Sequence, residues 1–121
     1  MEILAREIGF SLTGDYNASR LLWDNLDTNS ERRAILSDSG DFTYGQLAVE
    51  AAKVGNVLLQ AGCKPRERIL LFLNDEPAYP AAIMGALRAG FVPVLINTLT
   101  PPDLIRYCLQ DSSATAAVVS E

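Results

Sequence analysis

The sequence contains no histidine, and its 10 lysine and arginine residues are outnumbered by 15 aspartate and glutamate residues. Without histidine the chain lacks the commonest metal ligand and the side chain best suited to general base catalysis near neutral pH. A self-contained metal site or Ser-His site is therefore excluded. The net charge of -5 comes without a clustered basic face that would neutralise phosphates, so we expect no nucleic-acid partner.

Cysteines and long apolar runs are also scarce. The two cysteines, Cys63 and Cys108, form no CxxC pair, which excludes a zinc knuckle or a thioredoxin-type motif. Both thiols are expected to be buried as small hydrophobic side chains. No apolar run approaches the ~20 residues of a membrane-spanning helix, and residues 1–16 lack the continuous apolar stretch of a secretory signal. We therefore expect a cytoplasmic protein with no membrane partner.

Two glycine motifs for nucleotide binding are missing as well. A dinucleotide-binding fold should carry G-x-G-x-x-G after its first strand, and a phosphate-binding loop should read GxxxxGK followed by Ser or Thr. The sequence has neither motif. What it does have is enough apolar composition, 49% of 121 residues, to bury the core of one compact unit.

The clearest helix begins at a capping box. Thr43 and Gln46 have the spacing at which a threonine hydroxyl accepts from the third backbone N–H while a glutamine reaches back. Apolar residues then recur at intervals of three and four through Ala61, and Gly62 and Pro65 end the helix. A single long amphipathic helix is predicted.

The residues before this helix give shorter signals. Residues 17–26 predict a short helix, and residues 33–36 predict a strand that runs into a tight turn at residues 37–41. We divide the chain into a helical lead-in, residues 1–32, and an α/β unit, residues 33–121.

The second half alternates apolar strands with helices. Residues 69–73 are apolar at every position, as in a parallel strand covered on both faces, and further strands are expected at residues 92–96 and 115–119. One intervening helix ends at Gly90 and the next is capped by Thr100. This alternation predicts the α/β class, with a Rossmann-like parallel sheet and flanking helices.

Two stretches resemble core motifs of the adenylate-forming, AMP-binding superfamily. Phe42-Thr43-Tyr44-Gly45-Gln46-Leu47 resembles the first motif, and residues 85–94, GALRAGFVPV, resemble the second. The benzoate-CoA ligase branch is resembled by residues 16–18, by Asp75 with the Tyr79-Pro80 pair, and by residues 97–100. The resemblance covers nearly the whole chain and implies the N-terminal part of the large domain of an acyl-CoA synthetase.

The resemblance implies a parent enzyme that uses ATP, Mg²⁺ and CoA on a small carboxylic acid. The carboxylate attacks ATP to give an acyl-adenylate and pyrophosphate, and the CoA thiolate then displaces AMP. The family's phosphate loop, ribose-binding aspartate and C-terminal lysine have no counterpart here. We therefore expect no catalytic residue, no tight cofactor binding and no activity in this fragment alone. The alternative is a free-standing, non-enzymatic α/β binding or interaction module.

Four positions deserve a structural test. Thr43 could mark an anion site at a helix start, although capping is the simpler interpretation. Asp75 follows a strand, where α/β sheets bind ligands, and it is also well placed to cap the next helix. Arg88 lies in a last helical turn, where a cation is stabilised by the helix dipole, and the resemblance implies contact with the nucleotide part of CoA. Gly85 is expected to let its helix approach the sheet.

One expectation concerns association. The parallel sheet of such a domain needs both faces covered and its edges protected, and the resemblance implies that later strands and helices do this. We therefore expect the isolated chain to self-associate.

Overall fold

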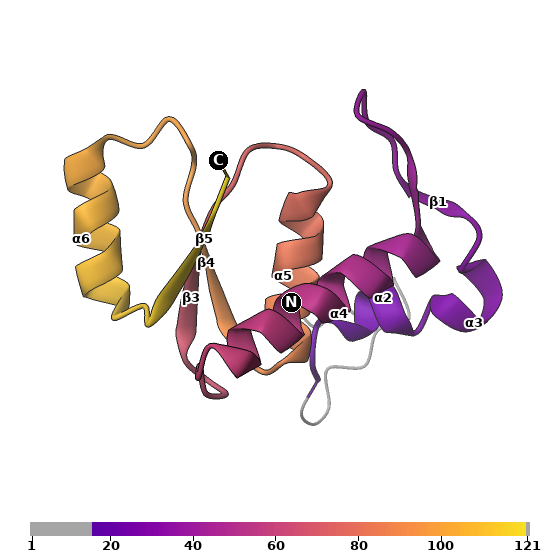
Figure 1. Ribbon diagram of the computed structural model, residues 1–121, viewed down its shortest axis with the longest axis horizontal. Helices are drawn as coiled ribbons and strands as arrows, with labels where there is room; N and C mark the ends of the chain where they lie inside the picture. The colour runs from indigo at the N-terminus through magenta and orange to yellow at the C-terminus, as the bar shows by residue number, and fades with distance from the viewer. Residues whose placement is uncertain (1–15, 121) are drawn as a thin grey trace, which may run out of the picture.

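The computed structural model describes residues 16–120 and contains a three-stranded sheet, a two-stranded sheet and five helices within that range. Figure 1 shows the small hairpin sheet projecting from one end of the molecule and the larger sheet at its centre. The described elements, in chain order, are α2 (Arg20–Trp23), α3 (Leu26–Asn29), β1 (Arg33–Ile35), β2 (Phe42–Thr43), α4 (Tyr44–Gln60), β3 (Arg68–Phe72), α5 (Ala78–Arg88), β4 (Val92–Leu95), α6 (Pro102–Ser112) and β5 (Ala116–Val119).

The larger sheet has the order β4-β3-β5, and both pairings are parallel. Its central strand is β3, where Ile69, Leu70 and Leu71 are at most 2% exposed. Ile69 lies opposite Pro93 on one side and Ala116 on the other. The prediction of three parallel strands is confirmed, and Pro93 lies on an edge strand, where its missing N–H is tolerated.

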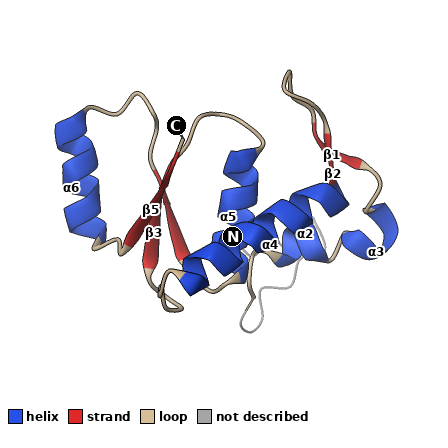
Figure 2. Ribbon diagram, in the orientation of Figure 1, coloured by secondary structure: helices blue, strands red, loops and turns tan. Residues whose placement is uncertain are grey.

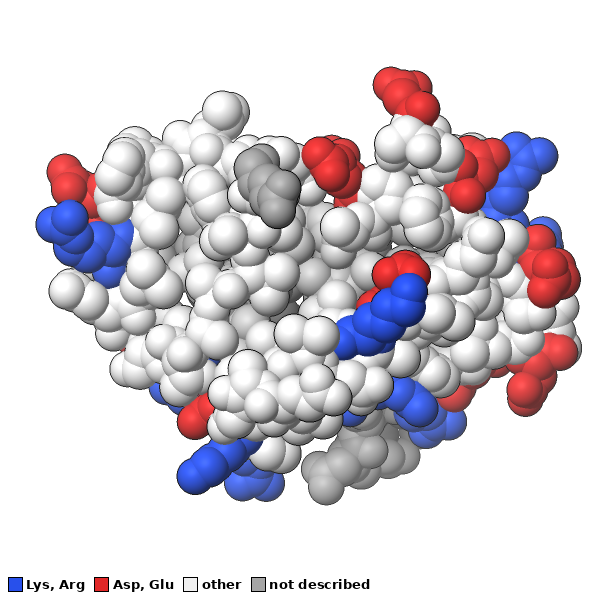
Figure 3. All heavy atoms as spheres, in the orientation of Figure 1, with Lys and Arg blue, Asp and Glu red and all other residues white. Residues whose placement is uncertain are grey.

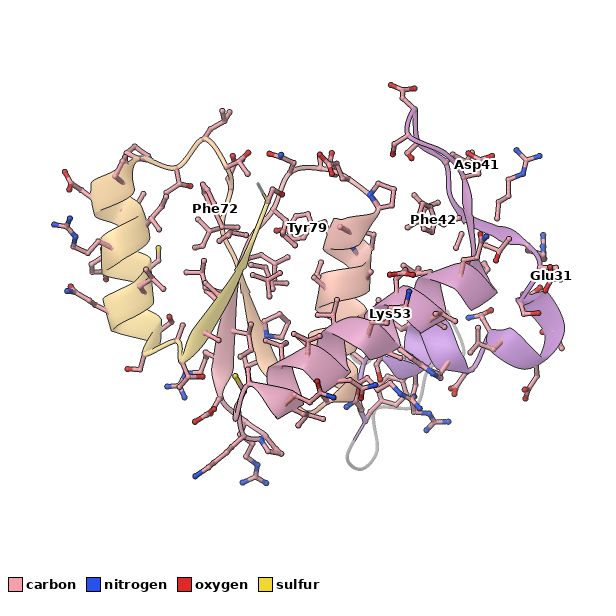
Figure 4. All side chains as sticks on the ribbon, in the orientation of Figure 1. Glu31, Asp41, Phe42, Lys53, Phe72 and Tyr79 are labelled. Atoms are coloured by element: carbon pink, nitrogen blue, oxygen red, sulfur yellow. The ribbon has the colours of Figure 1, made fainter. Side chains whose placement is uncertain are left out.

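The sheet has a helix on each side. Figure 2 shows α5 and α6 on opposite sides of it, with α4 on the side of α5. Because successive side chains of a strand point to opposite faces, β3 contributes to both sides. Figure 4 places Phe72 on the α6 side of the sheet and Tyr79, from α5, on the other side.

The capping box at the start of α4 is present as predicted. The Thr43 Oγ accepts from the Gln46 backbone N–H at 3.2 Å, and the Gln46 Oε1 accepts from the Thr43 backbone N–H at 2.9 Å. After α4, Gly62 adopts φ of +90°, the left-handed conformation that favours glycine. Both ends of the helix are therefore set by local sequence.

The α4 helix joins two hydrophobic clusters. One cluster packs the lead-in against α4 and the start of α5, and the other packs α4 and α5 against the sheet. Burying one aliphatic side chain fully stabilises a fold by about 1.5–3 kcal/mol. Because α4 contributes buried side chains to both clusters, it holds the two halves of the molecule together. The buried members are Leu22, Leu47, Ala48, Ala51 and Ala81 in the first cluster, and Leu58, Ile69, Leu71, Leu73, Ala82, Ala86 and Phe91 in the second.

Helix α6 is amphipathic in sequence but has no buried residue. Leu104 and Tyr107 on this helix are 50% and 59% exposed. The helix begins at Pro102 with Pro101 as its N-cap, so the prediction of a Thr100 cap is wrong. A second proline at the first helical position already supplies the helical φ angle there.

Four further features differ from the expectations. Within residues 16–32, the described part of the lead-in, there are two short helices rather than one, and the strand at residues 33–35 pairs with β2 in an antiparallel hairpin that was not predicted. Arg33 and Asp41 form an ion pair across that hairpin at 3.1 Å. Cys63 and Cys108 are half-buried rather than buried. Gly85 approaches α4 and not the sheet.

The surface gives two further observations. No helix in residues 16–120 is long and apolar enough to span a membrane. The face drawn in Figure 3 is largely uncharged, with acidic and basic side chains in small groups mostly toward its rim.

Candidate functional site

The chain connections place a crevice at the carboxyl ends of β3 and β4. The chain leaves β3 toward α5 on one face of the sheet, and it leaves β4 toward α6 on the other face. Two neighbouring strands whose connections diverge in this way define a topological switch point, where open α/β sheets bind ligands. A cavity of about 350 Å³ lies there, lined by Leu73, Asp75, Tyr79, Leu95, Ile96, Asn97 and Thr98.

The polar groups of this switch-point crevice come from two loops. Asp75 follows β3 and is exposed, and Asn97 and Thr98 follow β4. The Asn97 Oδ1 accepts from the Leu99 backbone N–H at 2.8 Å, and the Asn97 carbonyl accepts from the Thr100 N–H at 2.9 Å. The first bond is that of an Asx turn and the second closes a β-turn over residues 97–100, and together they hold the second loop in shape. The crevice thus combines apolar walls with a few positioned polar groups.

Asp75 does not cap the following helix. The N-cap of α5 is Pro77, and no side-chain capping bond is present there. The capping interpretation is therefore wrong, and the carboxylate of Asp75 is left at the mouth of the crevice. Its interpretation as a ligand contact stays a prediction. One carboxylate without a histidine or lysine beside it can accept hydrogen bonds from a neutral or cationic group.

Arg88 lies at the other end of α5. Its Cζ is 4.1 Å from the centroid of the Trp23 ring, in cation-π geometry. Since α5 has 11 residues, its ends are roughly 16 Å apart at 1.5 Å per residue. The structure therefore does not bring Arg88 to the switch-point crevice. Trp23 was not predicted as its partner, because no local spacing links two residues so distant in sequence.

Two observations bear on Mg²⁺ and on the start of α4. Among residues 16–120, no group of three or more His, Cys, Asp or Glu side chains could hold a metal ion. At the start of α4, the Gln46 N–H that an anion would need already donates to Thr43. The helix-capping interpretation of Thr43 is therefore confirmed.

The chain matches the family model described as AMP-binding enzyme over residues 22–121. It is 37% identical over 109 residues to a benzoate–CoA ligase from Thauera aromatica, and 38% identical over 111 residues to a 4-hydroxybenzoate–CoA/benzoate–CoA ligase from Rhodopseudomonas palustris. Each alignment covers 88% of this chain but only 21% and 20% of the relative. The chain thus spans about a fifth of the length of these relatives.

Solved structures give the same picture. A benzoate CoA ligase from Burkholderia xenovorans LB400 superimposes with a TM-score of 0.82 at 38% identity, over 87% of this chain and 22% of that protein. An anthranilate CoA ligase in complex with anthranoyl-AMP gives a TM-score of 0.83 at 31% identity, over 86% of this chain and 20% of that protein. The fold described above is therefore the fold of the corresponding part of these ligases.

Proposed function

The chain belongs to the family of AMP-binding enzymes, and we propose that it is part of a ligase that joins an aromatic carboxylic acid to CoA. This proposal rests on a difference in sequence identity between two groups of relatives. Two benzoate-type CoA ligases are 37% and 38% identical to the chain, whereas peptide synthetases aligned over the same 88% of it are 25–28% identical. The difference favours an aryl-CoA ligase over an amino-acid-activating enzyme.

The proposed reaction has two half-reactions. A carboxylate oxygen attacks the α-phosphorus of ATP, which releases pyrophosphate and leaves an acyl-adenylate. The CoA thiolate then attacks the acyl carbon, a thioester forms, and AMP leaves. Mg²⁺ would neutralise phosphate charge in the first step. In both half-reactions the nucleophile comes from a substrate, and no described residue is assigned a catalytic role.

We assign this chain a positioning role in the parent enzyme. The switch-point crevice, with Asp75, Asn97 and Thr98, would form one wall of the ligand site, because α/β sheets bind ligands at such crevices. Arg88, at the far end of α5, would contact the nucleotide part of CoA. The described part of the lead-in, residues 16–32, would brace α4 and α5, and the parent enzyme would act in the cytoplasm.

The complete reading frame around this segment provides the test. The encoded protein is expected to extend several hundred residues beyond the segment and to form benzoyl-CoA, AMP and pyrophosphate from benzoate, ATP and CoA. The 121-residue chain alone is the control and should release no pyrophosphate above background. A complete protein that adenylates amino acids but no aromatic acid would refute the proposal. A native protein whose intact mass equals that of the 121 residues would favour a free-standing module instead.

A further inference from the structure

The carboxyl end of α5 is closed by its own backbone. The Gly90 N–H donates to the Leu87 carbonyl at 3.0 Å, and the Phe91 N–H donates to the Ala86 carbonyl at 2.9 Å. Gly90 has φ of +86°, so the two bonds form a complete Schellman motif. The helix end therefore needs no side chain from elsewhere in the chain to satisfy these two carbonyls.

Asn17 nevertheless reaches this helix end from 70 residues away in the sequence. Its Nδ2 donates to the Leu87 carbonyl at 2.7 Å, and its Oδ1 accepts from the Ser19 backbone N–H at 2.9 Å. The second bond is that of an Asx turn, and it fixes the orientation of the amide. Because the helix end is already closed, the bond to Leu87 is a tether between two segments and not a helix cap.

The same short segment makes two more contacts with α5. The centroid of the Trp23 ring lies 4.1 Å from the Arg88 Cζ, in cation-π geometry. Leu22 is 3% exposed and packs in the hydrophobic cluster that includes Ala81 of α5. We call Asn17, Leu22 and Trp23 the lead-in clasp, because all three bear on this one helix.

Helix α5 is otherwise held by small side chains. Each of its buried residues is alanine or glycine, and its larger apolar side chains are only half-buried. Small side chains make few dispersion contacts, so they resist a rotation of the helix weakly. Gly85, which lies against the backbone of α4, is the natural pivot of such a rotation. Leu87 is two residues and Tyr79 six residues from this pivot, about 3 Å and 9 Å along the axis, so a rotation moves Tyr79 about three times as far as Leu87.

We propose that Asn17 is a positioning residue that fixes the carboxyl end of α5 and, through the rigid helix, holds Tyr79 in place at the switch-point crevice. Tyr79 lines that crevice from the first turn of α5. A tether at Leu87 opposes the rotation that would carry Tyr79 away from the other crevice residues. This inference rests on the proposed function only in treating the crevice as a ligand site, and the contacts of the lead-in clasp belong to the chain itself.

Hydrogen exchange of the full 121-residue chain measures the tether directly. Asn17→Asp keeps the size of the side chain and the acceptor for the Ser19 N–H, but an ionised carboxylate cannot donate to the Leu87 carbonyl. We expect the Gly90 amide to exchange about tenfold faster in this variant at neutral pH. The Leu70 amide, in the central strand of the sheet, should keep its rate, because the opening is local and not global.

Asn25 provides a matched control. Its Nδ2 donates to the Leu21 carbonyl at 2.8 Å, a bond of the same kind and of nearly the same length that stays within the lead-in. Asn25→Asp should therefore leave the Gly90 amide unchanged. Asn17→Ser removes the amide donor without adding a charge, and it should speed exchange at Gly90 as Asn17→Asp does. Circular dichroism establishes that each variant is folded, and an unchanged Gly90 rate in both folded Asn17 variants would refute the tether.

The Tyr79 amide tests whether the tether acts on the crevice. This N–H donates to the Glu76 carbonyl at 2.9 Å, at the end of α5 that is far from Asn17. We expect it to exchange several-fold faster in both Asn17 variants and to keep its rate in Asn25→Asp. Faster exchange at Gly90 with an unchanged Tyr79 amide would confine the effect to the helix end and would overturn the positioning role.

Kinetics of the complete protein separate the positioning role from a loss of folded enzyme. A smaller folded fraction lowers kcat at unchanged KM, whereas a displaced crevice wall should raise the KM of benzoate, ATP or CoA several-fold in Asn17→Ser, with kcat within about twofold. Unchanged KM values for all three substrates would refute the role at the crevice. The exchange measurements need no ligase activity, so the tether can fail while benzoyl-CoA still forms, and it can be present in a protein that forms none.

Discussion

The crossing of α4 and α5 should be the position in this fold most sensitive to a single added methyl group. A Cβ placed on Gly85 would lie well inside van der Waals contact of the Ala51 carbonyl oxygen, and 3.1 Å from Val54 Cβ. The Ala51 oxygen is a backbone atom of α4, so it cannot turn away as a long side chain could. Gly85→Ala must therefore push the two helices apart.

Two opposing terms decide the size of the effect. Replacing glycine by alanine in a helix interior favours the helix by about 1 kcal/mol. Against this, separating the helices by roughly 1 Å forfeits about a quarter to a half of each dispersion contact along the seam. Overpacking of a core costs about 1–3 kcal/mol, and a clash with backbone belongs at the upper end. We expect Gly85→Ala to lower the unfolding free energy by about 2 kcal/mol.

Urea unfolding followed by far-ultraviolet circular dichroism measures this difference, and two other glycines serve as matched controls. Gly55 lies in α4, and its added Cβ would be 2.9 Å from the Gly85 carbonyl oxygen. Gly45, in the first turn of α4, would place its Cβ 3.3 Å from the Ser30 carbonyl oxygen. All three are helical, so the propensity gain is similar and the loss should increase in the order Gly45, Gly55, Gly85. A Gly85→Ala chain as stable as Gly45→Ala would refute the close crossing.

Two further outcomes follow from the capping box and from α6. Thr43→Ala removes the hydroxyl that accepts from the Gln46 N–H and should lower the free energy of unfolding in urea by about 1 kcal/mol. Thr43→Ser keeps the hydroxyl and should lower it little. Equal losses in the two variants would mean that the bond does not stabilise the helix. The chain should sediment as species larger than a monomer at micromolar concentration, because Leu104 and Tyr107 are exposed on α6 and the outer edges of β4 and β5 have no partner strand among the described residues. A double variant with Leu104→Glu and Tyr107→Glu should shift the population toward monomer, whereas the control variant Gln110→Glu should not. A strictly monomeric parent chain would contradict the expectation of self-association.

The elements that could be predicted are those whose signals are local. The capping box, the glycine-terminated helix and the all-apolar strand each occupy one short stretch, and all three are present with ends within one or two residues of the prediction. The parallel pairing could also be predicted, because strands that alternate with helices leave few topologies. The switch-point crevice was predicted only in part, since Asp75 was considered as a ligand contact only as the alternative to a helix cap, and Asn97 and Thr98 were not considered.

The features that escaped prediction depend on contacts between distant residues. Strand β2 is two residues long, too short for any alternation, and forms only because β1 lies beside it. Gly85 was expected to let its helix approach the sheet, because a glycine in a helix sequence does not show which neighbouring element packs closely against it. The stacking of Arg88 on Trp23 joins the lead-in to the end of α5, and neither residue type predicts the other.

The two ends of helix α5 each contribute a residue to one of the two proposed ligand contacts. Tyr79, in its first turn, lines the switch-point crevice, and Arg88, in its last turn, lies over Trp23. The lateral position of the helix is set between them, where Gly85 meets the backbone of α4. A displacement of α5 at that crossing must therefore move both contacts together, since a helix of this length behaves as a rigid rod. The small residues of the α4–α5 seam thus do more than fill a core: they fix where both ends of the helix lie in relation to the rest of the molecule.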